Sequence, residues 1–563
     1  MKIWHSNWLR TQFTLQNTRP LRLALLAAIL LLGNIALSVR PLQAAPEAIC
    51  FIGISSPNSS YETFQEALDD TSCATIEIYN QNFSGSWFID RDVHIVGKTE
   101  IGPVNATFED GANGASIFTL TANIDVTIEE ITFKNGRSST GGAIQNLNES
   151  SSLTILDARF QGNQATTVIG GAIASRGPLT IKRTTFINNR ADIAGGAVHQ
   201  NPSSTIDVLI ENSVFDNNHV TDGHSGALYV LDGNVTVRNS TFKNNSSSSG
   251  DAGAVLLQSS SSVLIENSEF SNNSADTLGG ALRILGADNS NPLIIRSTEF
   301  NDNSADEHGG AIYATGSLTN LNISDSTFSG NAAELEGGAI YHKDGTFSIE
   351  NSEFSNNRAG SLGGALLITN AATANPMVIT SSQFNNNSAD QNGGAIYTIF
   401  SFTNLNISSS TFSGNAAELK GGAIYHDNGI LQIDSTLFEQ NRAGPEETGG
   451  AIDPAIQGGG IYKLFGQMML TNSTLQNNVS NTFGGGLMLN SVSDASISST
   501  HFFTNRSLGG GGAYNLLSTL AIEDSTFSAN VLAHVSQQGS ALTTQDGSTT
   551  IKNSTFSGNV DLS

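Results

Sequence analysis

The chain has 563 residues, and 25 Lys and Arg against 50 Asp and Glu give it a formal net charge of −25 at pH 7. An acidic surface of this kind argues against nucleic acid and anionic lipid as partners. Only 13% of the residues are charged, so we expect a surface of Ser, Thr, Asn and Gly, as in long secreted β-proteins.

Residues 1–44 have the pattern of a secretory signal peptide. A basic N-terminal stretch is followed by the apolar run Leu23–Leu37, and small residues at Ala44 and Ala45 suit the cleavage site. The alternative is an uncleaved anchor, but the run is shorter than the roughly 20 residues that a span needs. The mature chain is therefore expected to be secreted or displayed at the cell surface, without a transmembrane span.

Two cysteines, Cys50 and Cys73, lie near the mature N-terminus. In an oxidising compartment a disulfide between them would close the start of the fold. The alternative is a pair of free buried thiols.

Residues 45–130 are expected to form an N-terminal cap and the first irregular coils. Ser60–Asp69 predicts a short helix with Ser60 as its cap and with Phe64, Ala67 and Leu68 on one face. Such a helix can cover the open end of a stacked fold. Thr75–Tyr79 and Asp92–Gly97 alternate as strands do.

From Ile131 to the C-terminus one short phrase recurs, which makes 131–563 a repeat domain. Its aromatic position returns at steps of 25 to 30 residues, apart from one step of 37, with Leu475 replacing the aromatic once. A fixed period of this size indicates a stack of similar coils, about sixteen here. The aromatic residues are Phe133, Phe160, Phe186, Phe215, Phe242, Phe270, Phe300, Phe328, Phe354, Phe384, Phe412, Phe438, Phe502, Phe527 and Phe556.

An asparagine follows the aromatic position by three residues in every coil but the first, which has Gly136 there. Asn tolerates the left-handed backbone of a sharp turn, and stacked amides can hydrogen-bond from coil to coil. The pattern predicts an asparagine ladder along a parallel β-solenoid. Its members are Asn163, Asn189, Asn218, Asn245, Asn273, Asn303, Asn331, Asn357, Asn387, Asn415, Asn441, Asn478, Asn505, Asn530 and Asn559.

A glycine pair marks a second strand in each coil. The residue two positions after the pair is aliphatic, whereas the next one varies, so alternation predicts that the first points inward and the second outward. Tyrosines recur at the outward position, where a stacked row could form a platform for sugar rings; ordinary cross-coil stacking is the alternative. These candidate ligand-binding residues are Tyr229, Tyr313, Tyr341, Tyr397, Tyr425 and Tyr462.

The order of capping helix, strand, Asp92-Val93-His94-Ile95-Val96-Gly97 and short coils resembles the right-handed parallel β-helix of the pectin-lyase-like superfamily. The phrases Gly309-Gly310-Ala311-Ile312 and Phe328-Ser329-Gly330-Asn331 look like the repeats of chlamydial polymorphic outer membrane proteins. The resemblance implies an all-β solenoid at a bacterial surface. Both phrases are structural, so the resemblance does not by itself assign an activity.

Enzymatic motifs of that superfamily are not found. Gly223-His224-Ser225-Gly226 is the nearest to a polygalacturonase motif, but it stands where a coil has its glycine pair and is expected to be a variant turn. No catalytic residue, cofactor or metal site is predicted. An acidic row could bind Ca²⁺ weakly through oxygen ligands, with a solvated turn as the alternative. Its members are Asp192, Asp276, Asp306, Glu334, Glu336, Asp390 and Glu418.

Two further features stand out in the repeats. Asn303–Gly345 matches Asn387–Gly429 at a shift of 84 residues, which indicates duplication of a three-coil block. The 37-residue step contains an inserted loop that includes Glu446, Glu447 and Asp453 and could mark a binding edge.

Together these patterns predict a secreted or cell-surface β-helix scaffold with an adhesin-like or glycan-binding role and no catalysis. The partner would be a polysaccharide, a cell-surface glycan or a surface protein. Two alternatives stay open. One is a polysaccharide lyase or hydrolase, which needs carboxylates beside Arg or Lys on adjacent coils, and the other is a purely structural spacer.

Overall fold

The computed structural model describes residues 48–562 apart from 54–59, 100–105, 112–113, 261, 287–292, 317–319, 370–375, 400–402, 446–452 and 534–537. The expected signal peptide, 1–44, and Glu446 and Glu447 of the inserted loop therefore lie outside the described residues. Residues 48–563 form one compact unit, a parallel β-solenoid of about 17 turns with almost no helix. The predicted fold class is confirmed.

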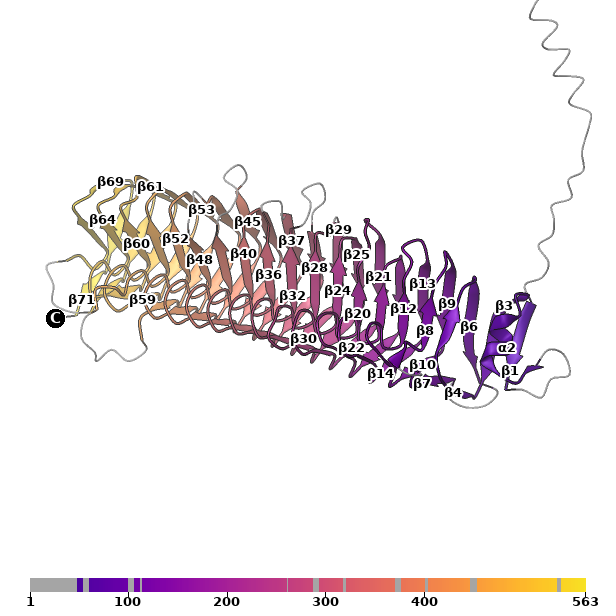
Figure 1. Ribbon diagram of the computed structural model, residues 1–563. Coiled ribbons are helices and arrows are strands. Elements are labelled where there is room, and N and C mark those ends of the chain that lie inside the picture. The colour runs from indigo at the N-terminus through magenta and orange to yellow at the C-terminus, as the bar shows by residue number, and fades with distance from the viewer. Residues whose placement is uncertain are drawn as a thin grey trace, which may run out of the picture. The chain divides into compact units, whose positions relative to one another are not determined.

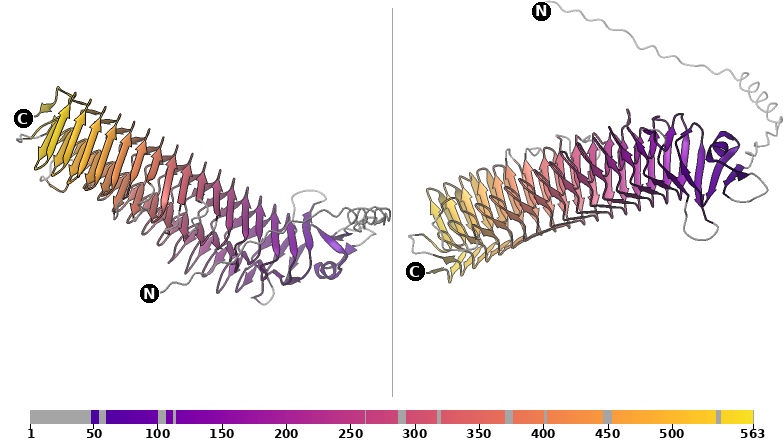
Figure 2. Two further views of the ribbon diagram at one scale, coloured as in Figure 1. Left: turned by 90° about the horizontal axis from the view of Figure 1, so that it is seen from above. Right: turned by 60° about the horizontal axis from the view of Figure 1, so that its bottom comes forward.

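Each coil contributes one short strand to each of four parallel sheets, which we number I to IV in the order that the chain enters them after the glycine pair. One coil shows the pattern: β36 (Ile312–Thr315), β37 (Asn320–Ser324), β38 (Thr327–Ser329) and β39 (Ala332–Ala333). Every strand pairs in parallel with its equivalent one coil further on, as from Tyr313 to Tyr341 and from Phe328 to Phe354. The views in Figures 1 and 2 show these equivalent strands side by side along the stack.

The sheets begin at different points of the cap region and then advance by one strand per coil. Sheet I contains β5 (Trp87–Ile89), β8 (Phe118–Leu120), β12 (Ile144–Asn146) and every fourth strand to β68 (Leu542–Gln545). Sheet II contains β1 (Ala48–Ile52), β2 (Ser60–Tyr61), β3 (Cys73–Tyr79), β6 (Val93–Lys98), β9 (Asp125–Glu129) and every fourth strand to β69 (Ser548–Lys552). Sheet III contains β4 (Asn82–Ser84), β7 (Thr107–Glu109), β10 (Thr132–Lys134) and every fourth strand to β70 (Thr555–Ser557). Sheet IV runs from β11 (Arg137–Ser138) by the same step to β71 (Val560–Asp561).

The interior is one continuous apolar core in which like side chains stack. From Phe133 to Phe438, successive phenylalanine rings of sheet III lie 4.6–4.9 Å apart and within 11° of parallel. Leu475 continues the row, and Phe502 and Phe527 stack beyond it. A parallel solenoid repeats each position at the strand spacing, so one residue choice is reused in every coil.

The asparagines form a hydrogen-bonded ladder between sheets III and IV. Each side-chain amide nitrogen donates to the amide oxygen of the next coil's asparagine at 2.9–3.0 Å, from Asn163 to Asn559. The same nitrogen donates to a phenylalanine carbonyl, as Asn331 does to Phe300 at 2.9 Å. Gly136 joins through its backbone, which donates to Asn163. The ladder therefore satisfies buried turn groups that water cannot reach.

The expectation that the ladder asparagines themselves adopt the left-handed backbone of the turn is wrong. The left-handed conformation belongs to the residue before the ladder asparagine, for example Asn188 (φ 55°) and Gly330 (φ 66°). The ladder residue is instead selected by its two-sided amide, which donates and accepts along the stack.

Helix α2 (Phe64–Asp69) covers the N-terminal end of the stack (Figure 1). Its buried residues are the predicted Phe64, Ala67 and Leu68, and the Phe64 ring lies 4.9 Å from that of Phe108 and 5.6 Å from that of Phe118. The N-cap is Thr63, and not Ser60, because Thr63 and Glu66 form a capping box. Ser60 belongs to strand β2.

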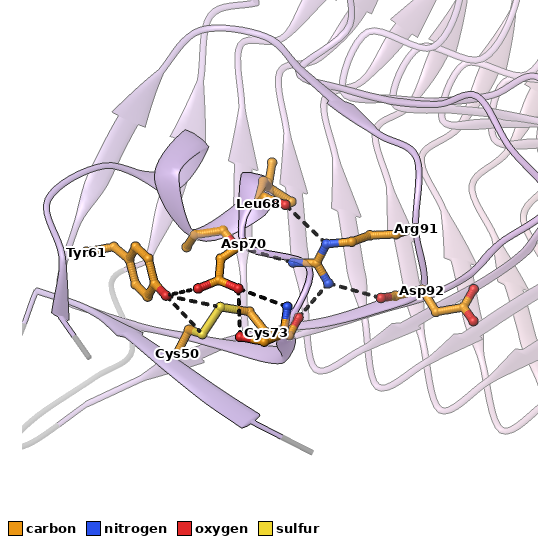
Figure 3. The surroundings of a disulfide bond; sticks show 9 residues. Cys50, Tyr61, Leu68, Asp70, Cys73, Arg91 and Asp92 are labelled. Carbon is orange, nitrogen blue, oxygen red and sulfur yellow. Dashed lines mark hydrogen bonds between the residues drawn. A yellow bond between two sulfur atoms is a disulfide. The ribbon is translucent and has the colours of Figure 1, made fainter. Parts of the chain in front are cut away.

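A disulfide joins Cys50 of β1 to Cys73 of β3, with the Cα atoms 5.5 Å apart (Figure 3). Beside it, the Tyr61 hydroxyl donates to Asp70 at 2.5 Å, and hydrogen bonds from Ser72 and Tyr61 hold the pKa of Asp70 at about 2. Arg91 donates to the carbonyl oxygens of Ala67 and Leu68 at the end of α2. These contacts fasten the capping helix to the first strands.

Candidate functional site

The outer face of sheet I carries the row of residues that the sequence analysis expected to point outward. Cross-strand pairing runs without a break through Tyr229, Leu256, Arg283, Tyr313, Tyr341, Leu367, Tyr397, Tyr425, Tyr462, Met488 and Tyr514. All lie outside the main core, whereas their neighbours in sequence, such as Ile312 and Ile340, belong to it. We call this set of residues the outer row.

The tyrosines of the outer row lie on strands β24 (Leu228–Leu231), β36, β40 (Ile340–Lys343), β48 (Ile396–Ile399), β52 (Ile424–Asp427), β56 (Ile461–Leu464) and β64 (Ala513–Leu516). Tyr514 was missed in the sequence analysis. The signal was present, because Gly510-Gly511-Gly512-Ala513 precedes it, but Ala513 fills the inward position that is aliphatic and larger in other coils.

The ring faces of these tyrosines are turned toward one another. Ring centroids are 4.9 Å apart for Tyr313 and Tyr341, 4.7 Å for Tyr397 and Tyr425, and 5.0 Å for Tyr425 and Tyr462, with interplanar angles of 16–26°. A sugar ring would need a free aromatic face to stack on. The geometry therefore corrects the expected platform: within these pairs the row offers ring edges and hydroxyl groups, not faces.

A second row of side chains partly covers the outer row. It is made of the residues just before the glycine pairs, which pack against the rings. The His308 ring lies 4.9 Å from that of Tyr341, the Lys420 ammonium 5.0 Å from the centre of Tyr462, and the Phe483 ring 4.7 Å from that of Tyr514. Tyr462 is consequently only 1% exposed and Tyr397 5%, whereas the other tyrosines predicted for this row are half-buried.

The hydroxyl groups divide the tyrosines into two sets. Tyr229 donates to Gln258 at 2.7 Å, Tyr462 accepts from Asn490 at 3.0 Å, and Tyr514 donates to Gln545 at 2.5 Å. For four others, no hydrogen bond joins the hydroxyl to any described residue. These four are Tyr313, Tyr341, Tyr397 and Tyr425.

Burial raises the pKa of all four hydroxyls, with nearby carboxylates such as Glu336 and Asp427 contributing at Tyr341 and Tyr425. The groups therefore stay protonated at neutral pH and can both donate and accept hydrogen bonds. They are suited to a ligand with hydroxyl groups.

The segment around His224 is a variant turn. Ser225 takes the place of the first glycine of the pair with φ 68°, and its hydroxyl donates to the carbonyl oxygens of Leu228 and Ala254. In the next coil Ala252 stands at the same position with φ 60°. The left-handed backbone that glycine adopts freely is thus held here by non-glycine residues, at some conformational cost.

A charged cluster surrounds this variant turn and was not predicted. The Asp251 carboxylate, which is almost fully buried, accepts hydrogen bonds from Thr277 and forms an ion pair with Arg283. His224 Nδ1 lies 3.2 Å from the same carboxylate, and burial and Arg283 lower the pKa of His224. Arg283 also lies 5.7 Å from the centre of the Tyr313 ring.

The cluster has one carboxylate, and that group is already neutralised. Most glycoside hydrolases use a pair of carboxyl groups that flank the scissile bond, and an arginine in an ion pair is a poor base. The arrangement is therefore better suited to holding adjacent coils together than to acid–base chemistry.

The acidic row gives no sign of a metal site in the part of the chain that the structure describes. No group of three His, Cys, Asp or Glu is there arranged to hold an ion. Burial first, and then the neighbouring Asp276 and Glu334, raise the pKa of Asp306. Glu336 does not belong to this row, since it covers the outer row and lies 3.5 Å from His308. Asp390 is paired with Arg358 at 2.7 Å.

Asp453 is the described member of the predicted loop site. Its carbonyl oxygen accepts from Thr482 at 2.6 Å, and its carboxylate accepts from the backbone of Ala455 at 2.8 Å. The bond from Thr482 ties the described end of the insertion to the next coil, and the bond from Ala455 fixes the local turn.

Three basic residues point into the solenoid from sheet I, which sequence reasoning missed. His342 and His426 are buried, and neither ring nitrogen of His342 has a hydrogen-bond partner among the described residues. Lys463 donates to the carbonyl oxygens of Asn428 and Gly429. Burial lowers the pKa of His342 to about 4 and that of Lys463 to about 7. Alternation could have indicated their inward direction, because each directly follows an outer-row tyrosine.

Comparison with known families agrees with this architecture. The model of the right handed beta helix region matches residues 175–359, and the Chlamydia polymorphic membrane protein repeat matches residues 381–399 and 409–427. The predicted resemblance is thus confirmed, and the solenoid is of the right-handed type.

Comparisons with curated proteins and with solved structures do not assign a function to the chain. No curated protein matches the chain. A solved structure of a PL6 family alginate lyase aligns with 92% of this chain and 100% of its own at 10% identity, but its TM-score of 0.18 is too low to carry an argument. Among the described residues there is no helix with the length and apolarity of a membrane span.

Proposed function

We propose that this chain is a non-catalytic scaffold, secreted or held at the cell surface, that binds a neutral glycan at four tyrosines of the outer row of sheet I. The observation that carries the proposal is the set of four tyrosine hydroxyls, at Tyr313, Tyr341, Tyr397 and Tyr425, without a protein partner among the described residues. Half-buried hydroxyls of this kind bond to water in the free protein, and the hydroxyl groups of a glycan can take the place of that water.

Several features support a location outside the cytoplasm. The disulfide between Cys50 and Cys73 suits an oxidising compartment. The match to repeats of a Chlamydia polymorphic membrane protein and the signal-peptide pattern of residues 1–44 favour export to the surface. An adhesin-like role with a glycan as ligand is consistent with these features.

The second candidate is a polysaccharide lyase or hydrolase, favoured by Asp251 and Arg283 lying on adjacent coils. However, Asp251 and Arg283 neutralise each other in an ion pair, which leaves neither free to act as an acid or a base. If the ligand or substrate contacts the acidic row, we expect Ca²⁺ to change its binding weakly, because carboxylates are ligands for this ion.

The proposal can be tested with the mature chain, predicted to begin at Ala45, on immobilised neutral polymers (xylan, mannan, β-1,4-glucan) and acidic ones (pectate, alginate), with and without Ca²⁺. Retention and new chain ends are scored together. We expect retention on at least one neutral polymer, no cleavage, and loss of retention when the four tyrosines are replaced by Phe.

Cleavage of any polymer would overturn the proposal in favour of the enzyme. The absence of retention on all of them would leave a spacer or a protein-binding adhesin. The matched control is Tyr229→Phe with Tyr462→Phe, which removes two hydroxyls that already have protein partners.

A further inference from the structure

The four tyrosine hydroxyls that have no partner among the described residues come from the two copies of the duplicated block. Tyr313 and Tyr341 lie in the first copy, Asn303–Gly345, and Tyr397 and Tyr425 lie at the same places in the second, Asn387–Gly429. In each copy the two rings are direct cross-strand neighbours with nearly equal spacing, 4.9 Å and 4.7 Å. The duplication has therefore produced two similar tyrosine pairs on one face.

The interval between the pairs is set by the solenoid. Pairing runs from Tyr341 through Leu367 to Tyr397, so equivalent tyrosines are three coils apart. At the strand spacing this is about 14 Å along the axis. A linear polymer lying along the outer row would meet both pairs.

These four tyrosines differ from the other tyrosines of the outer row in whether the hydroxyl has a hydrogen-bond partner. Tyr229, Tyr462 and Tyr514 lie outside the two copies, and each has an amide side chain from the following coil on its hydroxyl. At the corresponding places beside Tyr313, Tyr341 and Tyr397, the following coil has Lys343, Thr369 and Asp427, and no hydrogen bond to them is formed. Tyr397 is only 5% exposed, and its hydroxyl has no partner among the described residues.

The charged neighbours of the two pairs have opposite signs. Glu336 precedes the glycine pair before Tyr341, and Lys420 occupies the same place before Tyr425. Lys343 follows Tyr341 by two residues, and Asp427 follows Tyr425 by two. A ligand that relied on charge would be attracted by a residue at one pair and repelled by its counterpart at the other. What the copies share is hydroxyl groups and ring edges.

We propose that the two tyrosine pairs are equivalent subsites for one uncharged, hydroxylated polymer, which runs along the solenoid axis and occupies both at once. The inference rests on the proposed function and adds the number, spacing and ligand charge of the subsites. Each pair alone binds a short oligomer weakly. When a long chain binds at both subsites, the second binding event is intramolecular. The overall affinity then exceeds that of either subsite alone.

The test uses xylan and β-1,4-glucan, each as a long chain and as oligomers shorter than the three-coil interval, with binding measured by calorimetry on the mature chain. Two variants each remove one pair of hydroxyls and keep the ring stack: Tyr313→Phe with Tyr341→Phe, and Tyr397→Phe with Tyr425→Phe. The control is Tyr229→Phe with Tyr462→Phe. Thermal melting of each variant checks that the solenoid is intact.

We expect two short oligomers per wild-type chain, one per chain in either pair variant, and two in the control. Affinity for the long chain should fall about a hundredfold in either pair variant, since multivalent gains are of this order or larger. A single short oligomer per wild-type chain, or loss of all binding in only one pair variant, would refute the two subsites and leave the proposed function standing.

If neither glycan binds in either form and mannan is not retained either, both the subsites and the proposed binding to neutral glycans fail. Stronger binding to carboxymethylated β-1,4-glucan than to the unmodified chain would overturn the inferred absence of charge in the ligand. These outcomes separate the failure of the inference from the failure of the function.

Discussion

The inner and outer faces of the solenoid share one stacking geometry but differ in whether their polar groups are satisfied within the chain. Inside, rings of Phe300 and Phe328 stack at 4.8 Å and the asparagine beside them has every amide group bonded to the coil above or below. Outside, rings of Tyr313 and Tyr341 stack at 4.9 Å, but their hydroxyls have no partner among the described residues. The asparagine ladder is satisfied within the chain, whereas part of the outer row carries hydroxyls that a ligand could bond to.

The largest difference is expected from removing a ring. Phe328→Ala should lower the free energy of unfolding by about 3–5 kcal/mol, because a fully buried phenyl group leaves a cavity. Tyr341→Ala, which removes a half-buried ring, should cost about 1–2 kcal/mol. Chemical denaturation measures both, and hydrogen exchange of the neighbouring coils shows where the loss falls. Equal costs would contradict the distinction between the faces.

Replacing an asparagine of the ladder should lower the free energy of unfolding nearly as much. Asn331→Ala removes the acceptor of the Asn303 backbone N–H and of one Asn303 amide N–H, and the donor to the Phe300 carbonyl, in a dry interior, at about 3 kcal/mol in all. Asn322→Ala on the outer face is the matched control, since it loses only one hydrogen bond from Ser348. A change above about 1 kcal/mol in the control would show that surface amides matter as much.

Acid should destabilise the interior through His342. Its pKa is about 4 in the folded chain and near 6.5 when unfolded. The unfolded state therefore binds the proton first, and stability falls as the pH drops below about 6.5. Between pH 7.5 and 5 the loss from this residue should be about 2 kcal/mol, and His342→Leu should remove that part of the pH dependence.

The smallest effects should come from single hydroxyl groups. Tyr462→Phe should cost about 1 kcal/mol, because Asn490 loses its hydrogen-bond acceptor. Tyr341→Phe should cost less than about 0.5 kcal/mol, since no described residue bonds to that hydroxyl. Thermal melting compares the two, and an equal loss for Tyr341 would mean that its hydroxyl is satisfied within the protein.

Much of the fold could be predicted from the sequence because a solenoid repeats one local solution. The spacing of Phe328 and Asn331, repeated coil after coil, predicted the stack and its ladder, and period-2 alternation after the glycine pair separated inward Ile312 from outward Tyr313. Thr63 as the true N-cap escaped prediction because several residues near a helix start can serve as caps, and only the capping box with Glu66 decides between them.

The candidate site depended more on tertiary structure. The sequence by itself determined which residues point outward, because direction follows from local alternation along one strand. Only the tertiary structure decided that the tyrosine faces are occupied, that Tyr229 and Tyr462 have partners for their hydroxyls, and that Asp251 meets Arg283. Those contacts join coils some 30 residues apart in sequence, and their outcome depends on rotamers and covering side chains that a one-dimensional pattern does not contain.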